Sequence, residues 1–366
     1  MHDVHLTAAL TVTLYEDWDR LPVTREQWNA VLNRGGTNTI FQTFEWNDAW
    51  LAAYGNRWRP MTLVARSGDE VVAIAPMVVD RSTPGPPRIT FQGYSNADYQ
   101  DFLGAPDHAT IRAFLDELKS RVPNAVIELS NVPAASATNT VIASATKAVG
   151  LWPLRRADSP CPTLLLHDQP EQGLHLIRKY SLRRPLNHFS RQGKVTAHKL
   201  VALDDALAQL GIFIDQHIRR WQQTSTPSRF CDDETRRFFE ELVLRLGGTG
   251  WLDFSVIRLD DKPLAYHFGF CYAGTLTWYK PSFEIAEARH SPGLLLIRNL
   301  IERALDEGLN EIDFTIGPEQ FKSRFTNHVR SNASWRLHPS RAAREAERIF
   351  RLARRWIGLI VKTRGG

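Results

Sequence analysis

The stretch that decides the fold is TWYKPSFEIAEARHSPGLLLIRNLIERALDEGLNEIDFTIGPEQFKSRF, residues 277–325. An apolar strand over Thr275–Tyr279 leads into it, and apolar residues at helical spacing predict a helix from Leu294 to about Glu307. Gly308 is expected to end that helix, because glycine readily adopts the left-handed conformation found there. A second strand is expected over Glu311–Ile316. The stretch is therefore a strand-loop-helix-strand unit.

The predicted helix begins with a Ser-Pro-Gly sequence at residues 291–293, which supplies a hydroxyl, a fixed φ and a bare backbone. Helix N-termini carry unpaired N–H groups and a partial positive charge, so this one could hold a phosphate. The alternative is a plain helix cap, because Ser is a good N-cap and Pro suits the first helical position. Arg289 and His290, which come just before the Ser-Pro-Gly sequence, favour the interpretation as a phosphate site. The predicted cofactor-binding residues are Arg289, His290, Ser291, Gly293 and Leu294.

Composition narrows the class of protein without identifying it. The 366 residues suggest two domains, and 43% hydrophobic residues can form ordinary cores. A net charge of +5 favours anionic partners but is not diagnostic of nucleic acid. Cys161, Cys231 and Cys271 form no CxxC pair, so we expect no metal site and a reducing cytoplasm. The N-terminus lacks a basic region typical of a signal peptide, and no run approaches ~18 apolar residues, so no membrane span is predicted.

One plan of elements occurs twice along the chain: strand, helix, helix, hairpin, strand, helix, strand, with a further helix closing the first half. Both halves should therefore be mixed α+β domains. The hairpins are Met61–Ala65 with Val71–Val79, and Leu252–Arg258 with Leu264–Cys271. The predicted domains are residues 1–168, a linker helix at 169–193, a second domain at 194–338 that carries the 289–294 loop, and a basic amphipathic C-terminal helix at 339–366.

Short motifs in a fixed order carry a family resemblance over roughly residues 40 to 336. They are Phe41-Gln42-Thr43-Phe44-Glu45-Trp46, Asp98-Tyr99-Gln100-Asp101, Ser181-Leu182-Arg183-Arg184, Arg219-Arg220-Trp221, and the stretch from Ser291-Pro292-Gly293 to Lys322. Together they resemble the GNAT-related CelD-like and FemAB-like acyltransferases. The resemblance implies tandem GNAT-like acyl-CoA N-acyltransferase domains, each a central, mostly antiparallel sheet flanked by helices.

The resemblance also implies acyl-CoA as co-substrate, with acetyl-CoA the first choice. The usual GNAT phosphate loop has several glycines behind a Gln or Arg, whereas this loop has Gly293 alone. FemAB-like relatives use aminoacyl-tRNA instead, so tRNA remains an alternative partner.

Two motifs are candidate substrate-binding sites. Asp98, Tyr99 and Asp101 lie in a polar loop after a strand, where carboxylates beside a Tyr could bind an amine or act as a general base. The alternative is a solvated loop with Asx turns. Arg220 and Trp221 close a predicted helix and are assigned to the substrate cleft, the alternatives being an ion pair for Arg220 and a core anchor, the usual role of Trp at such a place, for Trp221.

The candidate catalytic residues are His267, Tyr279 and Glu319. His267 lies in an alternating strand and could accept a proton, or be a hydrogen-bonded core residue. Tyr279 ends a strand where GNAT-like folds often keep a proton donor for the leaving thiolate. Glu319 and Lys322, three residues apart, would share one face of a helix. Lys322 is expected to face an anionic substrate group, the alternative being an exposed ion pair.

The tail Arg341–Lys362 has the pattern of a basic amphipathic helix. It suits an anionic membrane surface, and equally a helix docked on its own domain or on a second subunit of a homodimer. Its apolar positions are Ala346, Ile349, Phe350, Ala353, Ile357 and Ile360, and its opposite face carries Arg344, Arg348, Arg351 and Arg355.

These features predict a cytoplasmic acyltransferase that could attach peripherally to the inner face of the membrane. It would move an acyl group to an amine or hydroxyl on a small molecule or saccharide linked to exopolysaccharide or the cell envelope. The alternatives are an aminoacyl-tRNA-dependent transferase and a non-catalytic GNAT-like module of a membrane biosynthetic complex.

Overall fold

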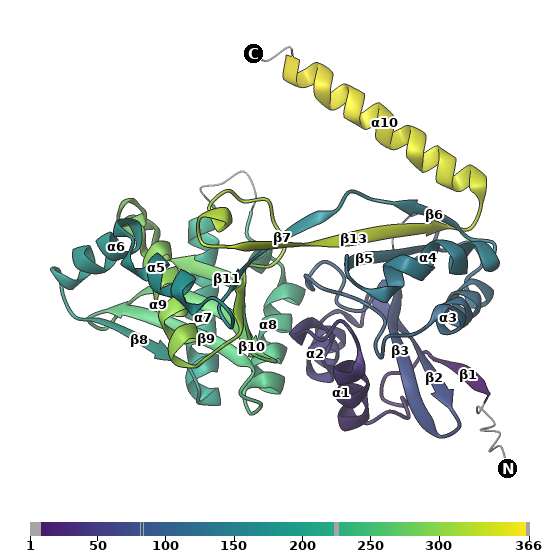
Figure 1. Cartoon of the computed structure of the whole chain (residues 1–366), viewed down its shortest axis with the longest axis horizontal. Coiled ribbons are helices and arrows are strands. Elements are labelled where there is room, and N and C mark those ends of the chain that lie inside the picture. The colour runs from purple at the N-terminus through teal and green to yellow at the C-terminus, as the bar shows by residue number, and fades with distance from the viewer. Residues whose placement is uncertain (1–8, 81, 83, 223–226, 364–366) are drawn as a thin grey trace. The chain divides into compact units, whose positions relative to one another are not determined.

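The computed structural model describes residues 9–80, 82, 84–222 and 227–363, with side chains described up to Ala353. They form two compact units that alternate along the chain (Figure 1). Unit 1 consists of residues 1–38, 56–158 and 332–366, and unit 2 of residues 39–55 and 159–331. The units are thus interleaved in sequence, whereas the domains expected from the sequence are contiguous.

Unit 1 is built on a sheet in the order β1-β2-β3-β4-β5-β13, with β6 also paired to β13. All neighbouring strands are antiparallel except β4 and β5, which are parallel. The strands are β1 (Leu10–Tyr15), β2 (Trp58–Ser67), β3 (Glu70–Asp80), β4 (Arg88–Phe91), β5 (Val126–Pro133), β6 (Trp152–Arg155) and β13 (His328–His338), of which Asn332–His338 lies in this unit; the helices are α1 (Arg25–Arg34), α3 (His108–Arg121), α4 (Ala137–Ala148) and α10 (Arg341–Thr363).

Unit 2 repeats this plan with the order β8-β9-β10-β11-β12-β7, in which only β11 and β12 are parallel. The mixed fold with mostly antiparallel sheets flanked by helices is therefore confirmed. The strands are β7 (Ser159–Leu165), β8 (Val195–Lys199), β9 (Leu252–Leu259), β10 (Lys262–Tyr272), β11 (Thr275–Phe283) and β12 (Glu311–Asp313); the helices are α2 (Phe44–Tyr54), α5 (Pro170–Arg178), α6 (Tyr180–Ser190), α7 (Leu203–Trp221), α8 (Asp233–Leu246), the 3₁₀ helix η3 (Ile285–His290) and α9 (Pro292–Asp306).

The last strand of each sheet comes from an unexpected part of the chain. β7 follows unit 1 in sequence and pairs with β12 of unit 2, where Leu165 lies opposite Glu311. β13 follows unit 2 and pairs with β5 of unit 1, where Leu337 lies opposite Ile127. Strands β6, β7 and β13 were absent from the sequence expectation, since prolines interrupt β6 and β7 and polar residues break the alternation of β13.

Helix α2 begins within the Phe41–Trp46 motif and belongs to unit 2. The Thr43 side chain accepts a hydrogen bond from the backbone N–H of Trp46 at 3.3 Å and so caps the helix. Trp46 is fully buried, with edge-on ring contacts to Phe238 and Phe270 at centroid distances of 5.2 and 5.4 Å. The aromatic anchors of this segment thus contribute to the core of unit 2.

Helix α9 packs against the sheet of unit 2 with α5 and α6 beside it (Figure 1). Leu296 and Leu300 are buried in a cluster that also contains Leu182 and Phe189 of α6. The segment expected to be a linker helix is therefore two helices that belong to the core of unit 2. Gly308 has a φ of +64°, which confirms it as the residue that stops this helix.

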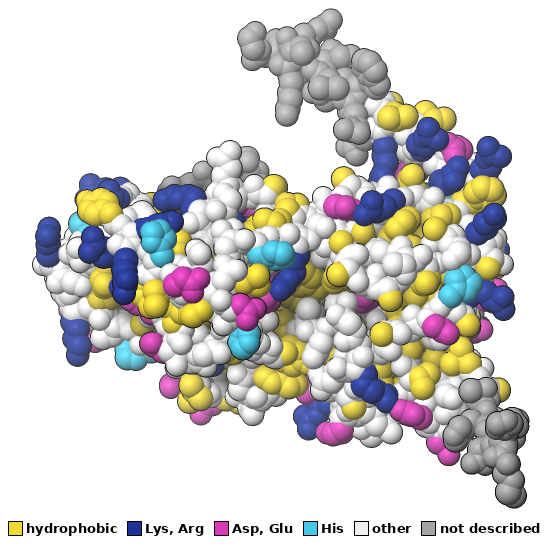
Figure 2. Space-filling view, viewed as in Figure 1, with side chains coloured by type: hydrophobic (Ala, Val, Ile, Leu, Met, Phe, Trp, Pro, Cys, Tyr) yellow, Lys and Arg dark blue, Asp and Glu magenta, His cyan; other side chains and the backbone are white. Residues whose placement is uncertain are grey.

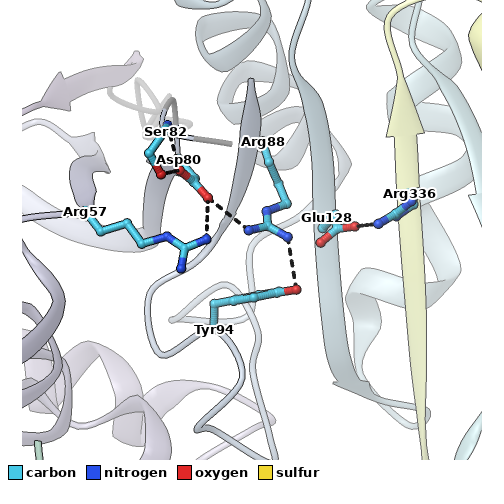
Figure 3. Close-up of polar contacts among 7 residues, drawn as sticks. All are labelled: Arg57, Asp80, Ser82, Arg88, Tyr94, Glu128 and Arg336. Atoms are coloured by element: carbon cyan, nitrogen blue, oxygen red, sulfur yellow. Dashed lines mark hydrogen bonds and ion pairs between the residues drawn. The ribbon is translucent and has the colours of Figure 1, made fainter. Parts of the chain in front are cut away.

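Two buried carboxylates hold unit 1 together at the ends of its central strands (Figure 3). The side chain of Asp80 is inaccessible to solvent and receives Arg57 and Arg88, each at 3.1 Å. Arg88 also donates to the Tyr94 hydroxyl at 3.1 Å, and Glu128 on β5 pairs with Arg336 on β13. Each carboxylate is compensated by a guanidinium, as burial of a charge requires.

Candidate functional site

The start of α9 leaves the Gly293 amide without an acceptor, whereas the Leu294 amide already donates to the Ser291 carbonyl at 3.0 Å. Ser291 has φ +62° and ψ +53°, and its side chain makes no capping hydrogen bond. Pro292 occupies the first helical position, and Gly293 follows without a left-handed φ. The first N–H groups of a helix have no intrahelical acceptor. Without a side-chain cap, the amide of Gly293 is therefore available to an anionic group.

A pocket of about 260 Å³ lies against this helix start. Its one charged lining residue is Arg220 at the end of α7, whose Nη1 donates to the Pro281 carbonyl at 2.8 Å. The guanidinium lies 4.2 Å from the ring centroid of Phe283. Burial lowers the pKa of Arg220 to about 10, so it remains protonated at neutral pH. The pocket is lined by Arg220, Trp278, Pro281, Phe283, Ala288, Ser291, Gly293, Leu294, Ile297 and Phe321.

Strands β11 and β12 diverge after Thr277, and this leaves space beside β11. The parallel pairing of β11 with β12 extends only from Thr275 to Thr277, whereas β11 itself continues to Phe283. The chain turns away after β12, where Thr315 has a φ of +57°. The next residues of β11, Trp278 to Phe283, thus have no partner strand on the β12 side within the described pairing. Such a split at the end of a parallel pair is a usual location for a ligand.

A β-bulge in β11 lies beside the split. The register with β10 shifts between Phe268 and Phe270, so that Gly269 lies opposite both Trp278 and Tyr279. A Cβ on Gly269 would lie 2.3 Å from the Thr277 carbonyl oxygen, so no larger residue fits. The bulge was not expected from the sequence, although a glycine inside a strand is the usual signal for one.

The equivalent region of unit 1 is closed. Helix α3 is capped by Asp107, whose carboxylate accepts a hydrogen bond from the backbone N–H of Thr110 at 2.8 Å. The gap beyond the parallel β4–β5 pair contains the protein's own loop, where Gln100 hydrogen-bonds to the carbonyls of Gln92 and Asn131 at 2.9 and 3.0 Å. A negative cap and a filled gap make this end of unit 1 unsuitable for an anionic ligand.

Of the residues predicted from sequence, Arg220, Ser291, Gly293 and Leu294 come together at the pocket. Trp221 does not line it, and its ring stacks on His217 with a centroid distance of 5.7 Å. The lining residues of β11, Trp278, Pro281 and Phe283, were not among the predicted site residues, because alternation along this strand assigns them equally well to the core.

Arg289 and His290 lie in η3, next to helix α6. The rings of His290 and His188 stack with centroids 3.7 Å apart, and Arg289 Nε donates to His290 Nε2 at 2.8 Å. Ligand atoms of His188, Glu287 and His290 lie within 4.8 Å of one another, close enough for one metal ion. Burial and then the charges of neighbouring groups, including Arg289 and Arg184, lower the pKa of His290. The basic surroundings favour an anion over a cation here.

The predicted catalytic residues do not line the pocket. His267 is fully buried on β10, where Nδ1 lies 3.1 Å from Asp253 Oδ1 and the ring stacks on Trp278. Asp253 also pairs with Arg303 at 2.6 Å. Burial acts to raise the pKa of Asp253, but His267, Arg303 and Lys199 together lower it to about 2. His267 is thus part of a buried ionic cluster.

Tyr279 lies among aromatic rings, with Phe41, Trp46 and Phe270 at centroid distances of 5.7, 5.8 and 5.5 Å. Its neighbour Trp278 contacts the pocket and the α9 core instead. Whether the hydroxyl of Tyr279 serves catalysis stays a prediction.

Glu319 and Lys322 form an ion pair, which was the alternative to a substrate contact, with Oε2 and Nζ 3.0 Å apart. The Lys322 side chain is only 5% exposed, and Nζ also donates to the Ile316 carbonyl at 2.9 Å. The pair therefore holds the loop that carries Phe321 at the pocket, and its ammonium is occupied by the protein itself.

Asp98, Tyr99 and Asp101 belong to unit 1. The Asp101 carboxylate accepts hydrogen bonds from the hydroxyls of Thr37, Ser136 and Thr138. Burial raises the pKa of this carboxyl, although each of the hydroxyls acts to lower it. The geometry gives Asp101 a clear structural role, and its substrate role stays a prediction.

Comparisons with known proteins agree with this geometry. Residues 178–323 match the model of the Acetyltransferase (GNAT) domain, and a search of curated proteins finds no match. A crystal structure of FemX has a TM-score of 0.62 and 10% identity, covering 86% of this chain and 96% of that one. L-PGS from Bacillus licheniformis has a TM-score of 0.54 and 13% identity, covering 92% and 97%. A tandem GNAT protein from the clavulanic acid biosynthesis pathway has a TM-score of 0.50 and 12% identity, covering 91% and 99%.

At these identities the solved structures show the fold alone, and they confirm the expected tandem GNAT-like fold. The GNAT acetyltransferase domain matched by residues 178–323 contains the open helix start and all the pocket-lining residues. The narrower CelD-like assignment stays a prediction.

Proposed function

We propose that the protein is an acyltransferase that binds acyl-CoA at the start of α9 and transfers the acyl group to an amine or hydroxyl. The observation that carries the proposal is the uncapped N-terminus of α9, which meets the Arg220 guanidinium at one pocket. Phosphate groups bind well where backbone N–H groups and an Arg converge. In unit 1 the equivalent helix start is capped by Asp107 and the equivalent gap is filled by the protein's own loop. We therefore propose one donor site, in unit 2.

The residues that line the pocket would hold the acyl donor in place. They do not supply the acid and the base of the reaction. Its apolar walls would exclude water from the thioester, and the β11 bulge leaves one residue, Trp278 or Tyr279, outside the ladder. A free backbone amide there would polarise the thioester carbonyl. The acceptor's nitrogen or oxygen attacks that carbonyl and forms the new C–N or C–O bond, a base takes the acceptor's proton, the C–S bond breaks, and the thiolate takes up a proton. Tyr279 remains the proposed proton donor, because it is part of the bulge.

The acceptor is proposed from the family resemblance alone, as an amine or hydroxyl on a small molecule or saccharide of the cell envelope. An aminoacyl-tRNA donor is the second candidate. One observation favours it: exposed cations on α5 and α6, between these helices and in the turn that follows have no ion-pair partner in the described part of the chain, and His188 links this surface to η3. These cations are Arg178, Lys179, Arg183, Arg184 and Arg191.

The test is a thermal-shift and native mass spectrometry series with acetyl-CoA, longer acyl-CoAs, free CoA and tRNA. Ligand at 100 times its Kd should raise the stability of the folded protein by about 2.7 kcal/mol. Binding of CoA and acyl-CoA, with release of free CoA when an amine acceptor is supplied, supports the proposal. Unchanged melting at millimolar acyl-CoA together with tRNA binding would favour the second candidate. Binding to neither would leave the non-catalytic module.

A further inference from the structure

Helix α10 contacts unit 1 through its polar face. The Glu347 carboxylate lies 2.9 Å from Arg336 and 3.3 Å from His338, both on β13. The guanidinium groups of Arg341 and Arg344 lie 6.0 and 5.4 Å from the ring centroid of Trp152 on β6. Arg341, Arg344 and Glu347 therefore lie on the side of the helix that contacts its own unit, whereas the side chain of Arg348 is 62% exposed.

Two apolar side chains in the described part of α10 are largely exposed to solvent. Ile349 is 65% exposed and Phe350 61%. Figure 2 shows hydrophobic side chains beside Lys and Arg on the described part of this helix. A helix docked on its own domain buries its apolar stripe and exposes its charges. In the described part of α10 the large apolar side chains are exposed instead. This argues against docking of the apolar stripe on its own unit.

The charge of α10 narrows the choice of partner. The range Arg341–Thr363 contains seven Lys and Arg against two Glu, a formal net charge of +5, which equals that of the whole chain. Pairing two copies of this helix through their apolar faces would bring two such charges together, which is unfavourable. An anionic surface would be attracted instead.

We propose that α10 attaches the protein to anionic phospholipid surfaces by inserting Ile349 and Phe350 into the headgroup boundary. No helix among the described residues is long and apolar enough to cross a membrane, so this attachment is to one face of a bilayer. The apolar positions Ile357 and Ile360, and Arg355 opposite, lie outside the residues whose side chains are described. The proposal is independent of the donor.

The test is co-sedimentation of the full chain with vesicles of phosphatidylcholine alone or with about one third phosphatidylglycerol. The full chain should pellet with the anionic vesicles only, and less as salt rises, because salt screens the attraction. Phe350→Glu should lower the partition coefficient at least about tenfold, because it removes a large apolar group from the interface. Val201→Glu is the matched control, since Val201 is 71% exposed outside α10, and it should bind as the wild type does.

Equal pelleting of wild type and Phe350→Glu, or no pelleting with anionic vesicles, would overturn the proposal. Light scattering of both proteins in solution tests the remaining alternative, in which the apolar face of α10 binds a second copy of the chain. A wild-type dimer that Phe350→Glu converts to monomer, without vesicle binding, would assign the apolar face to a second copy. Unchanged thermal melting of both variants would show that the loss of binding is not a loss of folding.

Discussion

Replacing Gly293 by valine should separate donor binding from folding. The residue lies in the first turn of α9 without a left-handed φ, so a side chain causes no backbone strain there. A Cβ would lie 3.4 and 3.5 Å from two ring atoms of Phe283, which is ordinary contact. Valine is also a slightly better helix former than glycine. The free energy of unfolding should therefore change by less than about 1 kcal/mol.

The same side chain should weaken the donor strongly. Valine's methyl groups would occupy the space in which a phosphate approaches the Gly293 amide. The loss of one hydrogen bond to a charged group costs about 1.5–3 kcal/mol, which corresponds to a rise in Kd of roughly 10- to 150-fold. Isothermal titration with CoA and acetyl-CoA measures this directly, and urea unfolding of the same samples measures stability.

Gly211→Val is the matched control, because Gly211 lies inside α7 with no atom within 4 Å of its would-be Cβ. It should leave both Kd and stability close to the wild-type values. If a folded Gly293→Val protein bound CoA as tightly as wild type, the helix start would not be the phosphate site.

Two further predictions concern stability. Arg88→Met should lower the free energy of unfolding by about 3 kcal/mol, because buried Asp80 loses one of its two guanidinium partners; Arg20→Met, which removes an exposed pair, should cost less than about 1 kcal/mol in the same urea titration. Burial, followed by the charges of nearby cations, lowers the pKa of His217 to about 3. Because the unfolded chain then binds the extra proton more readily, stability should fall by up to about 1.4 kcal/mol per pH unit from pH 6.5 toward 3. His217→Gln should flatten this dependence, and an unchanged slope would contradict the assignment.

Local signals predicted the order of elements well. The apolar spacing from Leu294 onward, the stop at Gly308 and the hairpins of both halves all appear in the structure. These features depend on residues close in sequence, whose spacing determines which face is buried. The strand β7 was missed for the converse reason: Pro160 and Pro162 weaken its local preference, and pairing with β12 compensates.

The candidate site was predictable only in part. Ser291 and Gly293 follow from the chemistry of a helix start, and Arg220, which was assigned to a substrate cleft, lines the same pocket. Alternation in β10 could not distinguish a catalytic His267 from a buried one, since Asp253, its partner, lies on a different strand. The bulge opposite Gly269 depends on strand register, which single-sequence patterns do not specify.

The strand exchange between the units has a consequence for how the chain is made. The sheet of unit 1 acquires β13 only when Asn332 comes to lie opposite Pro133, so a ribosome must add 199 further residues before that edge can close. Until then β5 presents an unpaired edge, which is prone to association with other chains. A gene cut between Asp158 and Ser159 would give one fragment without β13 and another without unit 1's first six strands. Neither fragment is expected to fold alone. The two units should therefore be inherited together in one gene and not as two separate domains.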